Sequence, residues 1–174
     1  MPDADAFTIR PLTRDDAPAW GALRLEALKN HPEAFGSSYE EFILLGAEQV
    51  AERIPEPGGE DVLFGVFSGG ELSGCGGFAR EKHLKGRHKG LMWGIYLRPS
   101  LRGTGAGDAL VSRVIEQARA HVEILTCAVN PENLGARALY LRHGFKVYGR
   151  EPRALRTGGR DHDEELLTLI LQPG

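Results

Sequence analysis

The stretch that decides the fold reads Leu91–Met92–Trp93–Gly94–Ile95–Tyr96–Leu97–Arg98–Pro99–Ser100–Leu101–Arg102–Gly103–Thr104–Gly105–Ala106–Gly107. Its apolar part, Gly90–Leu97, predicts a buried strand, and Asp108–Ala120 predicts an amphipathic helix after the turn. The glycines between them carry no Cβ, so several backbone N–H groups can converge on one ligand. The helix start adds unpaired N–H groups and the positive end of its dipole. The stretch therefore predicts a phosphate or pyrophosphate site.

Length and composition limit what such a site can serve. The chain has 174 residues, 41% hydrophobic and 26% charged, with a net charge of −3. This length suits a single domain over 1–174, and the absence of a basic excess argues against a nucleic-acid partner. No apolar run approaches the roughly 20 residues of a membrane span, and Met1–Ala6 contains no signal-peptide core. The two isolated cysteines favour a reducing, cytoplasmic setting.

The rest of the chain predicts alternating helices and strands. The expected strands are Phe7–Leu12, Val62–Phe67, Leu72–Arg80, Gly90–Leu97, Val122–Val129, Phe145–Gly149 and Glu164–Leu171. The expected helices run from a Thr13 cap to Asn30 and over Glu40–Ile54, Asp108–Ala120 and Asn133–His143. A polar, flexible-looking stretch, Pro152–Asp163, separates the last two strands. This order predicts an α/β (α+β) protein with a mixed sheet and helices on its faces.

Two common phosphate-binding motifs do not fit the glycine-rich turn. A dinucleotide-binding turn needs its third glycine three residues after the second, where this chain has Asp108. It also needs an acidic residue at the end of the next strand, where Val129 and Asn130 stand. A nucleoside-triphosphate loop needs Gly-Lys-Ser/Thr, which the turn lacks. A different phosphate-bearing ligand is therefore expected.

Two segments resemble signatures of the GCN5-related N-acetyltransferase (GNAT) family. The run from Arg102 to Gly107 matches Arg/Gln-x-x-Gly-x-Gly/Ala, and Asn133–Phe145 matches Asn-x-x-Ala-x-x-Leu-Tyr-x-x-x-Gly-Phe. The two occur in the family's order with a strand between them, and the order of elements follows the family over nearly the whole chain. The resemblance implies a mostly antiparallel sheet of about seven strands, splayed between the fourth and fifth, with about four flanking helices.

The resemblance also implies acetyl-CoA as co-substrate, with no metal. Its pyrophosphate would bind the N–H groups of Arg102, Gly103, Thr104, Gly105, Ala106 and Gly107. Its pantetheine arm would pair with the backbone of Ile95, Tyr96 and Leu97, and an N–H near Ile95 would polarise the thioester carbonyl. Tyr140 would give a proton or a hydrogen bond to the leaving thiolate; the alternative is a half-buried helix tyrosine that packs on the sheet. Asn133 would contact the pantetheine region or cap its helix.

The proton acceptor for the amine is not evident from the sequence. Some family members carry a glutamate on the central strand, but Gly90–Leu97 contains no carboxylate. The groups near or within that strand that can accept a proton are Glu81, His83, His88 and Tyr96, and each is also typical of a solvated hairpin or a packed strand.

Two groups of basic residues are candidates for binding a phosphate of CoA. One group, Arg80, Lys82, His83, Lys85, Arg87, His88 and Lys89, precedes the central strand, about 26 Å from the end that leads to the glycine-rich turn. The second group, Arg102, Arg137 and Arg142, is therefore better placed for the 3′-phosphate of CoA.

The resemblance leads to one activity and one alternative. We expect an acetyl group to pass from acetyl-CoA to a primary amine by direct attack, the amine belonging to a small molecule, an amino acid, or a protein N-terminus or lysine. Pro32–Phe42 is expected to cover the acceptor, with walls from Phe35, Tyr39 and Phe42 and a cation-attracting charge from Glu33, Glu40 or Glu41. Caps and hydrophobic contacts of a helix explain the same residues. The alternative is a non-catalytic acyl-CoA-binding or sensing module. Homodimers are common among similar proteins.

Overall fold

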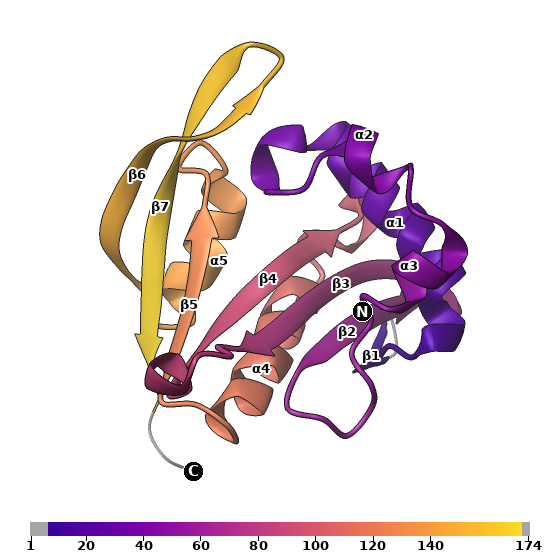
Figure 1. Cartoon of the computed structure of the whole chain (residues 1–174), viewed down its shortest axis with the longest axis horizontal. Coiled ribbons are helices and arrows are strands. Elements are labelled where there is room, and N and C mark those ends of the chain that lie inside the picture. Colours follow the sequence, from indigo (N-terminus) through magenta and orange to yellow (C-terminus); the bar gives the residue numbers. More distant parts are fainter. Residues whose placement is uncertain (1–6, 172–174) are drawn as a thin grey trace.

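The computed structural model describes residues 7–171, so Met1–Ala6 lies outside the described part of the chain. One seven-stranded sheet has the order β1-β2-β3-β4-β5-β7-β6 (Figure 1). The strands are β1 (Thr8–Pro11), β2 (Val62–Ser68), β3 (Glu71–Arg80), β4 (Lys89–Leu97), β5 (Ile124–Val129), β6 (Lys146–Thr157) and β7 (Arg160–Ile170). The helices are α1 (Ala17–Asn30), α2 (Tyr39–Phe42), α3 (Ala47–Ala51), α4 (Ala106–Arg119) and α5 (Leu134–Arg142). Short 3-10 turns are η1 (Arg14–Asp16), η2 (Pro32–Ala34), η3 (Leu84–Gly86) and η4 (Pro99–Leu101).

The sheet opens between β4 and β5, as predicted. These strands form the one parallel pair in the described sheet, and they pair only where Lys89, Gly90 and Leu91 lie beside Ile124, Leu125 and Thr126. Beyond these positions the two strands diverge, as the gap between them in Figure 1 shows. The later half of β4 therefore has β3 on one side only, and its other edge has no strand beside it.

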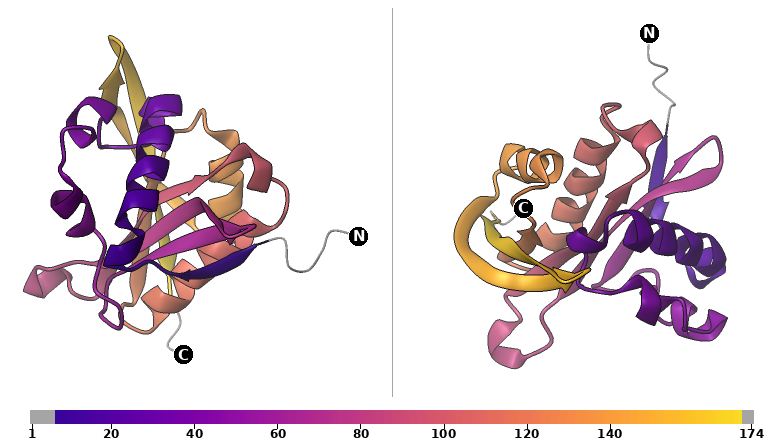
Figure 2. Two further views of the ribbon diagram at one scale, coloured as in Figure 1. Left: turned by 90° about the vertical axis from the view of Figure 1, so that its right-hand side faces the viewer. Right: turned by 90° about the horizontal axis from the view of Figure 1, so that it is seen from above.

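Two apolar cores hold the helices on opposite faces of the sheet. On one face α4 and α5 pack through Leu110, Val111, Val114 and Tyr140. On the other face α1 packs through Trp20, Leu23 and Leu28, together with Phe42 of α2 and Ala51 of α3. Figure 2 shows this division of the helices in its right-hand view. Five helices and seven strands confirm the predicted mixed sheet with flanking helices.

β4 carries a bulge at the point where it leaves β5. Cys75 lies opposite Tyr96 and Gly77 opposite Trp93, so Gly94 and Ile95 together face Gly76. Gly94 has φ +66°, a conformation that residues with a Cβ rarely adopt. The bulge changes which side chains of β4 point toward each face.

Two predicted elements were wrong. The helix expected over Glu40–Ile54 is divided into α2 and α3, because Gly46 adopts an extended conformation and begins α3 as its cap. The stretch expected to be flexible, Pro152–Asp163, instead belongs to a long hairpin of β6 and β7 that turns at Gly158 and Gly159. The hairpin curves over the end of the molecule where β6 contacts η2 (Figures 1 and 2).

Candidate active site

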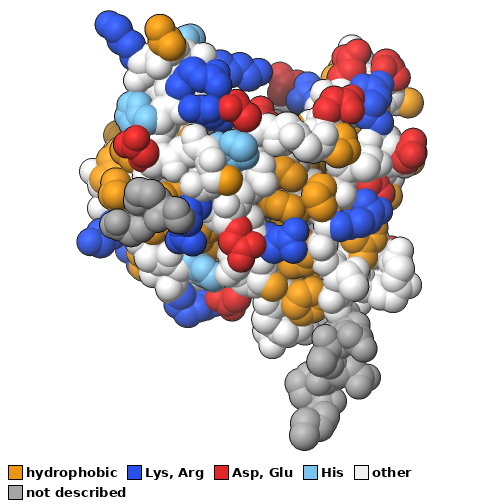
Figure 3. All heavy atoms as spheres, turned by 90° about the horizontal axis from the view of Figure 1, so that it is seen from below, with side chains coloured by type: hydrophobic (Ala, Val, Ile, Leu, Met, Phe, Trp, Pro, Cys, Tyr) orange, Lys and Arg blue, Asp and Glu red, His pale blue; other side chains and the backbone are white. Residues whose placement is uncertain are grey.

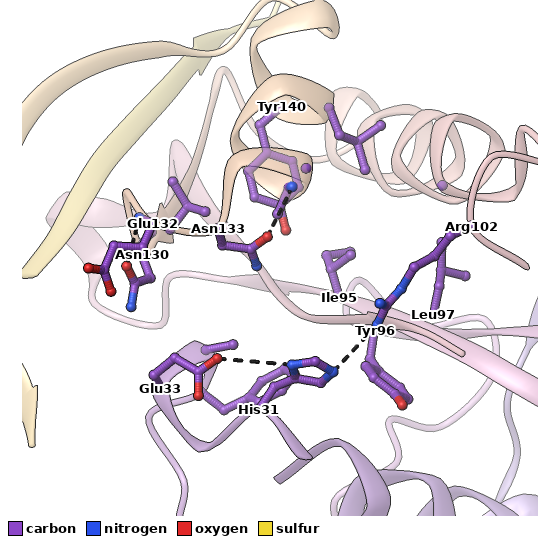
Figure 4. A pocket seen from close by; sticks show the side chains of 18 of the residues that line it. His31, Glu33, Ile95, Tyr96, Leu97, Arg102, Asn130, Glu132, Asn133 and Tyr140 are labelled. Carbon is purple, nitrogen blue, oxygen red and sulfur yellow. Dashed lines mark hydrogen bonds and ion pairs between the residues drawn. The ribbon is translucent and has the colours of Figure 1, made fainter. Parts of the chain in front are cut away.

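A cavity of about 810 Å³ occupies the opening between β4 and β5. Its walls come from β4, the turn before α4, the end of β5, α5, the η2 segment and the start of β7. Figure 4 shows Tyr140 and Asn133 on one side of this space and His31 and Glu33 on the other. Elements far apart in the sequence therefore meet around one cavity.

The glycine-rich turn has the geometry of an anion cradle. Gly103 and Gly105 have φ of +74° and +89°, and both line the cavity together with Gly107. Within residues 7–171 the N–H groups of Gly103 and Gly105 have no hydrogen-bond acceptor. These N–H groups, with the start of α4 at Ala106, fit an anionic ligand.

Two residues predicted for this cradle do not line the cavity. The Thr104 N–H donates to the Leu101 carbonyl at 3.4 Å, and the Thr104 hydroxyl donates to the same oxygen at 2.6 Å. The Ala106 N–H in turn donates to Thr104 Oγ1 at 3.4 Å, and Ala106 is fully buried. Thr104 and Ala106 therefore brace the turn.

Ile95, Tyr96 and Leu97 of β4, the residues predicted to pair with pantetheine, all line the cavity. The side chain of Tyr96 is occupied elsewhere, because its hydroxyl donates to Glu26 Oε1 of α1 at 2.9 Å. Burial and the neighbouring Glu26 carboxylate raise the pKa of Tyr96 to about 12. A phenol that already donates to a carboxylate, with this pKa, is poorly suited to accept a proton from an amine.

Tyr140 and Asn133 of the second signature face the same space. The Tyr140 hydroxyl is directed into the cavity (Figure 4), and it has no hydrogen-bond partner in the described part of the chain. The side chain is 6% exposed, and burial raises the pKa of the phenol above its usual range. Asn133 lines the cavity and caps α5, since its Oδ1 accepts from the Ala136 N–H at 3.2 Å.

The three arginines considered for a phosphate differ in position. Arg102 lines the cavity with Nη2 at 3.4 Å from His31 Nε2, and Arg142 lines it while paired with Asp108 at 3.2 Å. Arg137 does not line the cavity and is paired with Glu165 at 2.6 Å. Arg102 and Arg142 are thus the two that can face a ligand.

The basic cluster before β4 lies away from the cavity. None of its members lines the cavity, and Arg80 and Arg87 both pair with Glu60, at 2.5 and 3.1 Å. Figure 3 shows Lys and Arg side chains gathered at one corner of the face that it displays. The cluster is a solvated hairpin end, and Glu81, His83 and His88 are likewise absent from the cavity lining.

The residues predicted to bind the acceptor are only partly brought together. Glu33 and Phe35 line the cavity. Phe42 instead packs against Trp20 with ring centroids 5.8 Å apart, and the Glu41 carboxylate accepts a hydrogen bond from Ser38 at 3.0 Å. Tyr39 and Glu40 do not line the cavity either.

Sequence reasoning missed a polar group at the opposite wall. His162 of β7 is 8% exposed, and its Nε2 lies 2.9 Å from Thr157 Oγ1. Its Nδ1 lies 3.5 Å from Asn130 Nδ2, while Asn130 Oδ1 accepts from the Glu132 N–H at 2.9 Å. His162 and Asn130 line the cavity, as do His31 and Arg160. The Gly158–Gly159 pair was the signal that could have placed His162 in a hairpin strand.

An open sheet edge beside a glycine cradle and a buried tyrosine defines a protein that binds an acyl-CoA and acts on its thioester. Residues 22–145 match the model of the acetyltransferase (GNAT) family. Because this match covers most of the chain, the protein belongs to that family. It is an acetyl-CoA-dependent N-acetyltransferase.

Known proteins with similar sequences and folds support this assignment. L-methionine sulfoximine/L-methionine sulfone acetyltransferases of Pseudomonas paraeruginosa and Pseudomonas aeruginosa are each 28% identical over 116 residues, 66% of this chain and 67% of theirs. A phosphinothricin acetyltransferase from Sinorhizobium meliloti, solved with acetyl-CoA, has a similar fold with a TM-score of 0.82 at 19% identity, covering 97% of this chain and 90% of its own. A GNAT-family acetyltransferase from Streptococcus pneumoniae gives 0.81 at 23% identity, covering 95% and 99%.

Residues 7–171 contain neither a membrane-spanning helix nor a cluster of metal-binding side chains. No helix there is long and apolar enough to cross a membrane. No group of three or more His, Cys, Asp or Glu side chains in this part of the chain could hold a metal ion.

Proposed function

We propose that the protein transfers the acetyl group of acetyl-CoA to the primary amine of a small molecule by direct attack. The observation that carries this proposal is the short pairing of β4 with β5, which leaves the backbone of Ile95 and Leu97 at an open edge lining a cavity. Amide groups of pantetheine can pair with such an edge, because buried backbone groups without partners are costly. The turn at Gly103 and Gly105 lies in the same cavity and suits the pyrophosphate.

Three groups then divide the chemistry. A backbone N–H at the β4 bulge, near Ile95, is available to stabilise the oxyanion that forms when the amine attacks. The Tyr140 hydroxyl donates a hydrogen bond to the departing thiolate, and because burial raises the pKa of the phenol, the hydroxyl stays protonated while it does so. Asn133 orients the start of α5 and borders the pantetheine arm.

We assign the proton acceptor to His162. Asn130 Oδ1 is occupied by the Glu132 N–H, so Asn130 Nδ2 faces His162 Nδ1 as a donor. In this tautomer His162 Nδ1 accepts from Asn130 Nδ2 over a long contact of 3.5 Å, and Nε2–H donates to Thr157 Oγ1 at 2.9 Å. We propose that the amine, or a water bound to it, displaces the Asn130 donor and gives its proton to Nδ1.

The acceptor is proposed to be a small molecule because the curated relatives are named as acetyltransferases of L-methionine sulfoximine and L-methionine sulfone. We further propose that the enzyme works in the cytoplasm. Both cysteines are free and buried, and burial raises the pKa of Cys75 to about 11 and of Cys127 to about 12, which suits thiols kept reduced.

The test is acetyl transfer with the purified protein. Acetyl-CoA is mixed with L-methionine sulfone, a polyamine, a peptide with a free N-terminus and a peptide with an internal lysine, and free thiol release is followed. Acetylation of a small amine supports the proposal, and acetylation of the peptides alone rejects a small-molecule acceptor. Thermal stabilisation by CoA without turnover of any amine would favour the acyl-CoA-binding module.

A further inference from the structure

Arg24 of α1 is a buried arginine whose charge is not neutralised by the protein. The residue is 8% exposed. Within residues 7–171 its guanidinium forms no ion pair and donates no hydrogen bond. A guanidinium has five N–H donors, and burying a charge without a partner is strongly unfavourable. The contacts within residues 7–171 therefore leave the positive charge of Arg24 without a counter-charge.

The groups that face Arg24 do not supply a counter-charge. The Phe35 ring covers the guanidinium at 4.8 Å from its centroid. The Cys75 thiol is neutral, since burial raises its pKa to about 11, and it donates to the Gly94 carbonyl at 3.4 Å. Arg53 adds a second positive charge, and desolvation lowers the pKa of Arg24 itself. The local electrostatics thus favour an anion.

The position of Arg24 relates it to the reacting end of the cavity. A Cβ placed on Gly94 would lie 3.7 Å from Arg24 Nη1, with no other described atom within 4 Å beyond the neighbouring residues. Gly94 belongs to the β4 bulge and directly precedes Ile95, which lines the cavity. Phe35 lines the cavity as well. Arg24 does not line the cavity, but it lies immediately behind this part of the wall.

The N–H donors of Arg24 have no acceptor among the described residues. The Phe35 ring lies beside the guanidinium, with 4.8 Å between its centroid and Cζ, but an aromatic ring offers no oxygen to accept from N–H groups that donate in the guanidinium plane. Two N–H groups in the plane of a guanidinium can donate one hydrogen bond to each oxygen of a carboxylate. Arg24 Nη1 is the one described atom within 4 Å of a Cβ placed on Gly94, neighbouring residues aside, so we infer that such a group approaches from the Gly94 side.

Other arginines at the cavity are already engaged. Arg160 pairs with Glu132 at 2.8 Å, Arg142 pairs with Asp108 at 3.2 Å, and Arg102 donates toward His31 Nε2 at 3.4 Å. Arg24 is the buried arginine beside the cavity that, among the described residues, lacks such a partner.

We propose that Arg24 binds a carboxylate of the acceptor, so that the substrate is an amino acid or a close analogue with a primary amine near a carboxylate. This inference rests on the proposed acetyl transfer to a small amine. A carboxylate next to Gly94 lies beside the bulge at which the thioester carbonyl is proposed to be held. The α-amine of the same molecule then reaches that carbonyl within the length of one amino acid.

The experiment compares two acceptors that differ in one carboxylate. L-methionine sulfone and its decarboxylated amine, 3-(methylsulfonyl)propan-1-amine, are assayed by thiol release with the native enzyme, Arg24→Met, Arg24→Lys and Arg53→Met. Arg53 is an exposed arginine near Arg24, so it controls for loss of positive charge. We expect Arg24→Met to lower the ratio of kcat/KM for the sulfone over the amine at least tenfold, with a smaller loss in Arg24→Lys and no loss in Arg53→Met.

A second measurement keeps the proposal testable if turnover is slow or a variant is less stable. Thermal melting is recorded with and without sodium acetate, the simplest carboxylate. Acetate is expected to stabilise the native protein and Arg53→Met more than Arg24→Met. Removing a buried unpaired charge is also expected to raise the melting temperature of the ligand-free protein, whereas a purely structural Arg24 would make Arg24→Met melt lower.

The outcomes separate the two proposals. An unchanged preference ratio, or equal stabilisation of native protein and Arg24→Met by acetate, would overturn the role of Arg24. Acetylation of either amine would then still support the proposed function. Failure to acetylate any amine would reject the proposed function, and the acetate measurement alone would decide whether Arg24 binds a carboxylate.

Discussion

Replacing Tyr140 with phenylalanine isolates the contribution of one hydroxyl group. In the described structure this hydroxyl has no protein partner and points into the cavity from a side chain that is 6% exposed. A hydrogen bond to a charged group contributes about 1.5–3 kcal/mol. If the bond forms only as charge develops on the sulfur, its loss lowers kcat roughly 10- to 150-fold. KM for acetyl-CoA should change little, because the ground state does not use the bond.

The pH dependence of this variant gives a second check. The pKa of Tyr140 is raised above its usual value, so the hydroxyl keeps its proton at every pH below about 10, the ordinary value for a phenol. The ratio of kcat in native enzyme and Tyr140→Phe should therefore be constant between about pH 6 and 9. Any contribution of the neutral phenol to the free energy of unfolding is fully present below the pKa of tyrosine in the unfolded chain, about 10, and is lost only as pH rises through the raised pKa of the folded protein.

Thiol release under saturating amine and thermal melting together test the argument. The melting temperature of ligand-free Tyr140→Phe should not fall, because no protein hydrogen bond is removed from the described structure. A kcat within twofold of the native enzyme would refute the role of Tyr140. A ratio that changes tenfold across the pH range would show that the hydroxyl ionises during the reaction.

Three other substitutions test the remaining parts of the site. Gly105→Asp should weaken CoA binding at least 100-fold, as measured by calorimetry, because it adds a negative charge at the proposed pyrophosphate site. Gly69→Asp is the control, since Gly69 also has a positive φ and open space around its Cβ position but lies in the turn between β2 and β3. His162→Gln should lower kcat about 100-fold with little change in KM for acetyl-CoA, and an unaltered kcat would assign the proton to another acceptor. Glu33→Gln should raise KM for the amine but not for acetyl-CoA, whereas Glu40→Gln, which lies off the cavity, should change neither.

The fold could be predicted well where apolar periodicity and glycine signals agree. The strand Gly90–Leu97 and the turn after it were placed correctly, and the helix predicted at Asp108–Ala120 begins two residues earlier, at Ala106. The hairpin of β6 and β7 was missed because most of β6 is exposed on both sides, so its strand shows no alternation of apolar and polar residues. The single helix over Glu40–Ile54 was wrong because Gly46 interrupts it.

The candidate site could be predicted from the sequence only in those parts that are formed by the backbone. Gly103, Gly105 and Gly107 are recognisable because the role predicted for them depends on the lack of a side chain. His162 and Arg24 could not be found, since the roles proposed for them depend on neighbours that the fold brings from distant segments. Nothing near Arg24 in the sequence indicates that it is buried without a carboxylate, and only the packing of α1 against the β4 bulge reveals this.

The short contact between β4 and β5 also affects how the molecule holds together. The sheet consists of two halves, β1–β4 and β5–β7–β6, and the strand ladder between them is only three residue pairs long. A common core on the α4 and α5 face and the contact of β6 with η2 also hold the halves together. If the co-substrate binds along the open edge as proposed, it takes the place of a strand there and adds contacts between the two halves as well as supplying an acetyl group. Binding of the co-substrate would then make the two halves of the sheet unfold together more cooperatively.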